Sequence, residues 1–249
     1  MKVLLCLYLI LTLIGPLYIL ATRQIDFHAD YRTANRESAH LAPDPATTDE
    51  AVIQVYSARA FNWRGIVATH TWIAVKPRAT KVYHVYQIVG WRLYHNLPAL
   101  MTEADLPDRN WFNQKPEVIL DKRGPAAEKL IPEIEAAAHS YPYPNQYDVW
   151  PGPNSNTLPA YIARRIPELG LSLPSTAIGK DYIPGNKFFV RAPSGTGYQF
   201  SVFGLFGVML AKKEGLEINL LGLVYGVRFS PFAILLPGIG AIPSGNHSL

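Results

Sequence analysis

The chain has 249 residues, of which 49% are hydrophobic and 17% charged, and its formal net charge is +4. This length allows one substantial core, and the charged fraction lies below the roughly 25% of an average soluble domain, which favours contact with a membrane. The basic residues form no Lys/Arg block, so nucleic-acid binding has no support. The single cysteine, Cys6, and the lack of a His-x-x-x-His pair exclude a disulfide framework and the common zinc motifs. No metal or cofactor is predicted.

Residues 1–22 are predicted to be a membrane anchor or a signal. Positions 3–21 carry no charge, and about 20 apolar residues are enough to cross a bilayer. The segment Ile19-Leu20-Ala21 is a poor signal-peptidase site, which favours an uncleaved anchor over a cleaved signal peptide. The arginines that follow favour a cytoplasmic domain, but a signal-like N-terminus and a single cysteine favour export. We therefore expect a single-pass protein of the cell inner membrane with a periplasmic domain.

A polar linker and a folded domain follow this segment. Residues 23–50 contain Pro43 and Pro45 among polar residues, which is typical of a linker. Residues 51–245 are predicted to form a single α+β domain. Its first half contains runs rich in β-branched and aromatic residues, which predict strands over 51–60, 65–76, 81–91 and 117–121.

Two principal helices are predicted in the middle of the domain. The first covers residues 125–140, with Pro125 in its first turn and an apolar stripe on one side. Pro132 should break or kink this helix. A short strand over 147–150 leads towards the second helix, which covers residues 156–166.

The region 198–236 contains two apolar runs, 198–211 and 216–229, which the polar segment 212–215 joins. Polar residues and glycines inside both runs favour buried strands. A hairpin that dips into a membrane and a second membrane span remain alternatives. Together with the earlier strands, this region predicts a mainly antiparallel sheet with two principal helices.

The segment 150–157 contains the most specific candidate site. A Pro-Gly-Pro elbow delivers Asn154, Ser155 and Asn156 to the start of the second helix, where backbone N–H groups favour negative charge and can form an oxyanion hole. A serine hydroxyl attacks only with a base in hydrogen-bond reach, and His70 is the candidate base. The alternative is that Ser155 or Asn154 only caps the helix.

Three polar residues compete for the position that orients His70. His84 and Asp148 are two of them. Pairing the two histidine-bearing strands about the turn between them places His70 near Gln87 and three residues out of register with His84. Because side chains alternate along a strand, Gln87 is expected to share a face with His70, and His84 can do so only if a bulge intervenes.

The aromatic residues have two interpretations. The five tryptophans and the tyrosines between residues 141 and 147 pack a core by default. Alternatively, they line a groove that binds a ligand. The other predicted ligand contacts in that groove are Asn154, Asn156, Gln87, Trp150 and Asp148.

Two segments carry a resemblance to known families. In HTWIAVK (70–76) and WPGPNSNT (150–157) the chain resembles an uncharacterised bacterial family of membrane-anchored domains of unknown function. The order of these polar residues distantly resembles the circularly permuted papain-like superfamily, which includes NlpC-type cell-wall peptidases and lecithin:retinol acyltransferase. That resemblance implies a permuted papain-like scaffold, with Ser155 in the place of the nucleophilic cysteine, Leu158 in the place of an aromatic residue and His70 as the base.

These observations predict an envelope protein whose cleft binds a peptide, glycan or lipid ligand. Residual serine-dependent hydrolase or acyl-transfer activity through Ser155 remains open. The alternative is a non-catalytic structural or interaction protein that docks a membrane partner through its apolar C-terminal segment. The expected partners are therefore the membrane and one ligand of unknown class.

Overall fold

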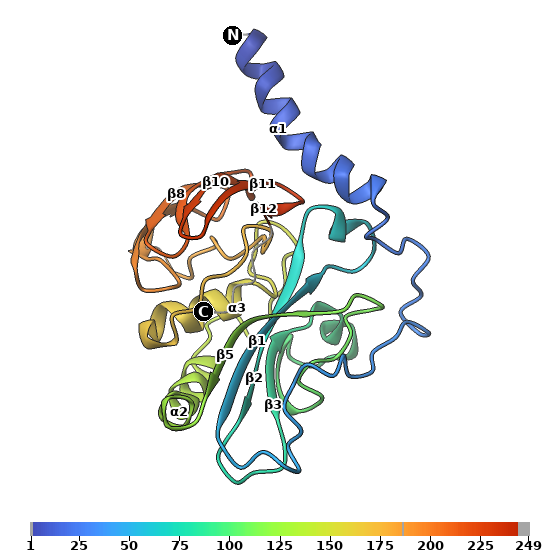
Figure 1. The fold of residues 1–249 in the computed structure, drawn as a ribbon, viewed down its shortest axis with the longest axis vertical. Coiled ribbons are helices and arrows are strands. Elements are labelled where there is room, and N and C mark those ends of the chain that lie inside the picture. Colours follow the sequence, from blue (N-terminus) through green and yellow to red (C-terminus); the bar gives the residue numbers. More distant parts are fainter. Residues whose placement is uncertain (1, 186, 244–249) are drawn as a thin grey trace.

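Two antiparallel sheets make up most of the domain (Figure 1). The computed structural model describes residues 2–185 and 187–243. A five-stranded sheet comes from the first half of the chain and a seven-stranded sheet from its last part, and helices α2 (Pro125–His139) and α3 (Thr157–Arg165) come between them in sequence. The α+β class and the two principal helices are confirmed, but two sheets replace the one that we expected.

The five-stranded sheet has the order β4-β3-β2-β1-β5. Its strands, in chain order, are β1 (Val52–Arg59), β2 (Thr69–Lys76), β3 (His84–Ile88), β4 (Leu100–Ala104) and β5 (Glu117–Arg123). All four strands expected in this half are present. Two of them are shorter than expected because short 3-10 helices, η1 (Asn62–Ile66) and η2 (Gly90–His95), lie beside them. The sequence did not indicate β4.

Both faces of this sheet are buried, which explains the nearly unbroken apolar runs of β1 and β2. On one face Ile53 and Ile73 pack with Ile134 of α2 and Ile162 of α3. On the other face Tyr56, Trp72 and their neighbours are covered in part by Leu41 and Ala42 from the predicted linker. The linker therefore lies against the sheet at this point. The Asp108 carboxylate holds it there, accepting hydrogen bonds from Ser38 and from the backbone N–H groups of residues 41 and 42.

Two features of the middle of the chain differ from expectation. Helix α2 is not broken at Pro132 but continues through it, since this residue lies on the exposed side of the helix, where water can hydrate the carbonyl that loses its partner. Residues 147–150 form irregular structure and a bend, not a strand. The Asp148 N–H donates to the carbonyl of Pro153 at 2.8 Å, which closes this segment into a loop.

The seven-stranded sheet is a meander in which each strand pairs with its neighbours in sequence. Its strands are β6 (Phe189–Arg191), β7 (Gly197–Val202), β8 (Phe206–Ala211), β9 (Gly215–Leu220), β10 (Leu223–Phe229), β11 (Phe232–Leu236) and β12 (Gly240–Ile242). The prediction of strands over 198–236 is confirmed. The prediction that these strands are buried is wrong for one face, where apolar side chains such as Phe200 and Val208 are exposed.

The buried face of this sheet contains a network of charged and polar side chains. Lys180 Nζ lies 2.8 Å from Asp181 Oδ1 and 2.6 Å from Glu217 Oε2. Burial lowers the pKa of Lys180, but the two carboxylates outweigh burial, so the pKa is raised and the amine is charged. Asp181 also accepts hydrogen bonds from Gln199 of β7 and Asn219 of β9. This network attaches the sheet to the loop that follows α3.

The N-terminal segment forms helix α1 (Lys2–Ala21), which projects from the domain beside β11 and β12 (Figure 1). It packs on the domain where Gly15 lies against the backbone of Pro237, so closely that a Cβ would be 1.9 Å from that carbonyl oxygen. Among the helices of residues 2–185 and 187–243, none combines the length and apolarity needed to cross a membrane. The inner-membrane location stays a prediction.

Replacement of Lys180 by methionine should strongly destabilise the fold. Lys180→Met should lower the free energy of unfolding by about 3–5 kcal/mol, because Asp181 and Glu217 would stay buried without their counter-ion. Lys81→Met is the control, since it removes an exposed ion pair. The Lys81 side chain is 53% exposed and that of its partner Asp49 is 85% exposed. The control should cost less than about 1 kcal/mol. Urea unfolding measures both changes, and equal costs would contradict the importance of the network.

Candidate functional site

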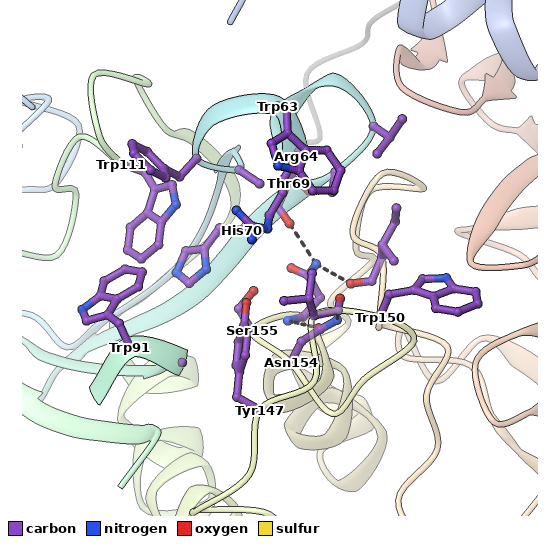
Figure 2. Close-up of a pocket in the computed structure, with 18 of the residues that line it drawn as sticks. Trp63, Arg64, Thr69, His70, Trp91, Trp111, Tyr147, Trp150, Asn154 and Ser155 are labelled. Carbon is purple, nitrogen blue, oxygen red and sulfur yellow. Dashed lines mark hydrogen bonds between the residues drawn. The ribbon is translucent and has the colours of Figure 1, made fainter. Parts of the chain in front are cut away.

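A cavity of about 690 Å³ is lined by both sheets and by the loop before α3 (Figure 2). Its volume is within the range of small-molecule sites. Short helix η1 contributes Trp63 and Arg64, β2 contributes His70, and the β9–β10 turn contributes Leu221. Most of the large side chains of the wall are aromatic, namely Phe61, Trp63, Trp91, Tyr94, Trp111, Tyr147 and Trp150.

Contacts with neighbouring groups fix two of these indole rings. The Trp111 ring is parallel to the His70 imidazole, with 3.6 Å between centroids and an interplanar angle of 5°. Trp150 Nε1 donates to the Leu221 carbonyl at 2.9 Å. Gly222 permits this approach, because its φ is +81° and a Cβ there would be 2.8 Å from Trp150 Nε1. The indole of Trp150 therefore joins the loop before α3 to the seven-stranded sheet.

His70 is buried and neutral. Its Nε2 lies 3.1 Å from Gln87 Oε1, and a carbonyl oxygen only accepts, so Nε2 carries the proton and Nδ1 is the acceptor. Burial lowers the pKa of His70 to about 4, although the hydrogen bond with Gln87 acts in the opposite direction. The structure thus brings Gln87 to His70, as strand alternation indicated.

His84 lies away from the cavity. It pairs with Val75 in the β2–β3 ladder, where Ile73 pairs with Tyr86. This register is shifted by two residues from the predicted one, which preserves the alternation of faces, so His84 and His70 point to opposite sides of the sheet. His84 is exposed, and so is Asp148. Neither is among the residues that line the cavity.

The side chains of Asn154 and Asn156 line the cavity but bond within the protein. Asn154 Oδ1 accepts from the Asn156 backbone N–H at 3.0 Å, and its Nδ2 donates to the Val149 carbonyl. Asn156 Nδ2 donates to the carbonyls of Thr69 and Ile178 at 2.8 and 2.7 Å. These amides therefore hold the start of α3 in place.

Ser155 lies between these two asparagines and lines the cavity with His70 (Figure 2). It is nearly buried, with 6% of its surface exposed. None of the hydrogen bonds among the described residues uses its hydroxyl, either with His70 or as a helix cap. The two residues of the predicted catalytic pair thus share one cavity without a direct bond.

The charged group of the site was not among the residues predicted from the sequence. Arg64 is the only Lys, Arg, Asp or Glu among the described residues that line the cavity, and its guanidinium lies 5.2 Å from the Trp63 ring centroid. Burial raises the pKa of Tyr147, and the positive charge of Arg64 lowers it, so the two groups are electrostatically coupled. The adjacent tryptophan and arginine between two strands were the signal for this site.

Comparison with known protein families assigns the chain to one of them. The model of DUF3750, a protein family of unknown function, matches residues 50–182, which is more than half of the chain. The chain belongs to this family. No curated protein and no solved structure matched it, so the papain-like arrangement stays a prediction.

Removal of the His70 ring should change the pH dependence of stability. The folded-state pKa is about 4 and the unfolded value about 6.5, so between these values the unfolded chain binds more protons. His70 should therefore reduce stability as pH falls from about 6.5 to 4, by up to about 1.4 kcal/mol per pH unit. His70→Gln should lose this slope, and His84→Gln on the far face should keep it. Urea unfolding across this range measures the slopes, and an unchanged slope in His70→Gln would refute a buried neutral ring.

Proposed function

We propose that this member of the DUF3750 family binds an amphiphilic ligand with one anionic group and an apolar body. The observation that carries the proposal is the lining of the cavity, in which a single cation, Arg64, stands among aromatic and aliphatic side chains. A guanidinium pairs with carboxylate or phosphate through two parallel hydrogen bonds. The indole rings provide contact for the apolar body.

The polar groups of the cavity favour a lipid-like ligand over a glycan. A sugar needs several free donors and acceptors along its length, and the amides best suited to supply them belong to Asn154 and Asn156. Those amides are already bonded to the backbone of the protein. The lining hydroxyls without a hydrogen bond among the described residues are those of Tyr94, Tyr147 and Ser155, and the charge of Arg64 acts on the Tyr147 phenol. A cation and a few hydroxyls suit one small anionic group. A peptide remains the less favoured ligand for the same reason.

The proposed activity is binding without catalysis. A general base works best with a pKa near the operating pH, and the pKa of His70 is lowered to about 4. Its Nε2 is engaged by Gln87 and its ring by Trp111. Ser155 therefore lacks an effective partner for proton transfer.

Removal of the cation should selectively weaken binding of anionic amphiphiles. Arg64→Gln should reduce the affinity for monomeric dodecyl phosphate by about tenfold to a hundredfold, the usual cost of a charged hydrogen bond. Its affinity for neutral dodecyl maltoside should stay unchanged. Arg78→Gln, at an exposed arginine outside the cavity, is the matched control. Tryptophan fluorescence during titration measures binding. Equal wild-type affinity for the two amphiphiles would sink the proposed ligand class.

Ser155 should not react as an activated nucleophile. A fluorophosphonate probe should label the wild type no more than Ser155→Ala, as measured by mass spectrometry of the peptide that contains residue 155. Because Ser155 makes no cap hydrogen bond, the alanine variant should keep the wild-type unfolding midpoint. An adduct at Ser155 that disappears in His70→Ala would establish hydrolase or acyl-transfer chemistry instead.

A further inference from the structure

The exposed face of the seven-stranded sheet, called here the outer face, is apolar throughout its central strands. Directly paired residues of antiparallel strands share a face, so the register identifies its members. Every outer-face residue of β7 to β11 is aliphatic or aromatic. Representative pairs are Tyr198 with Leu210, Phe200 with Val208, and Phe206 with Leu220.

This arrangement is the reverse of an ordinary sheet with one solvated face. The charged and amide side chains, including Glu217 and Asn219, are on the buried side. On the outer face Phe200, Val208 and Ile218 are 48%, 47% and 42% exposed. Soluble monomers rarely expose a contiguous apolar surface of several strands. The outer face therefore requires an apolar partner.

Helix α1 extends the same apolar surface. Thr12 Oγ1 lies 2.6 Å from the Tyr225 hydroxyl, and the Tyr8 ring packs on the Tyr225 ring. Tyr225 pairs with Ile218 and so belongs to the outer face. The exposed apolar side chains of α1 spread over about 200° of its circumference at 3.6 residues per turn. A partner must therefore cover a sheet face and more than half of a helix together.

The charges around the outer face have one sign. In the described residues from 187 to 243, the exposed charged side chains are Lys187, Arg191, Lys212 and Lys213. The acidic residues of this region, Glu214 and Glu217, are buried. A basic border around an apolar surface complements the anionic headgroups and acyl chains of a lipid leaflet.

We propose that the outer face and α1 together bind an anionic lipid bilayer. A second copy of the chain fits less well, since a two-fold contact between outer faces sets like basic borders against each other and leaves the exposed side of α1 uncovered. The bilayer covers both apolar surfaces at once. This inference does not depend on the ligand proposed for the cavity.

Fluorophores at two equally exposed positions test this contact in the full-length protein. In a Cys6→Ser background, Val208→Cys and Val82→Cys are labelled with nitrobenzoxadiazole, both sites being 47% exposed valines. With vesicles of phosphatidylcholine and phosphatidylglycerol, the label at 208 should shift to the blue and be quenched by nitroxide-bearing lipid. The label at 82 should be quenched by aqueous iodide. If iodide still quenches the label at 208 while the protein is bound to vesicles, the proposal is overturned. It is also overturned if the label is protected from iodide without vesicles and the protein has twice the mass of the monomer, because the outer face then binds a second copy of the chain.

Vesicle partitioning supplies the second test. The double variant Phe200→Ser, Val208→Ser should lower the partition coefficient at least about tenfold, whereas Val82→Ser, Leu97→Ser, which removes equally exposed side chains elsewhere, should not. The double variant Arg191→Gln, Lys212→Gln should reduce the preference for phosphatidylglycerol by more than about fivefold and leave binding to pure phosphatidylcholine unchanged. If Phe200→Ser, Val208→Ser leaves partitioning unchanged, α1 binds the bilayer alone and the proposed role of the outer face is wrong.

Discussion

The side-chain amide of Asn156 holds together the three segments on which the cavity depends. It bonds to Thr69 and Thr71 of β2 and to the carbonyl of Ile178 beyond α3, at 2.7 to 2.9 Å. The residue is buried, and a buried amide that loses its partners is costly. The five-stranded sheet, the start of α3 and the loop that leads to the seven-stranded sheet are therefore fixed relative to one another. The placement of His70 and Ser155 follows, since each is adjacent in sequence to a member of this set.

Hydrogen bonds within the protein limit which polar groups of the cavity are free to contact a ligand. The side-chain amides near the start of α3 and the imidazole of His70 are hydrogen-bonded to other parts of the chain, and burial keeps the imidazole neutral. The charge of the cavity comes instead from Arg64 of η1, which lies outside the two segments that resemble other families. The order of residues that resembles the papain-like superfamily therefore occurs here with a buried histidine whose pKa is lowered to about 4. Order along the chain does not define the protonation state of a histidine, because burial and its immediate neighbours do.

Local patterns predicted four strands of the five-stranded sheet, both principal helices and the pairing of His70 with Gln87, because these depend on periodicity and on the parity of a hairpin. Local patterns could not predict that Trp63 and Arg64 belong to the site. These residues reach it only because the folded chain brings η1 close to the loop before α3. For the seven-stranded sheet, the polar residues and glycines inside the apolar runs indicated strands but did not show which face was inside. The apolar face of this sheet is exposed, because the ion pairs and hydrogen bonds of Lys180 and Asp181 compensate the charged and amide groups on the buried face.

The boundary of the family match divides the lining of the cavity. The matched segment ends at residue 182, whereas Leu221 and Leu223 line the cavity from the β9–β10 turn, and Trp150 bonds to the carbonyl of Leu221. Part of the wall of the cavity therefore lies outside the segment that defines membership of the family. The residues that the family model covers form the scaffold of this cavity, but they do not set its whole size and polarity, because the β9–β10 turn closes one side.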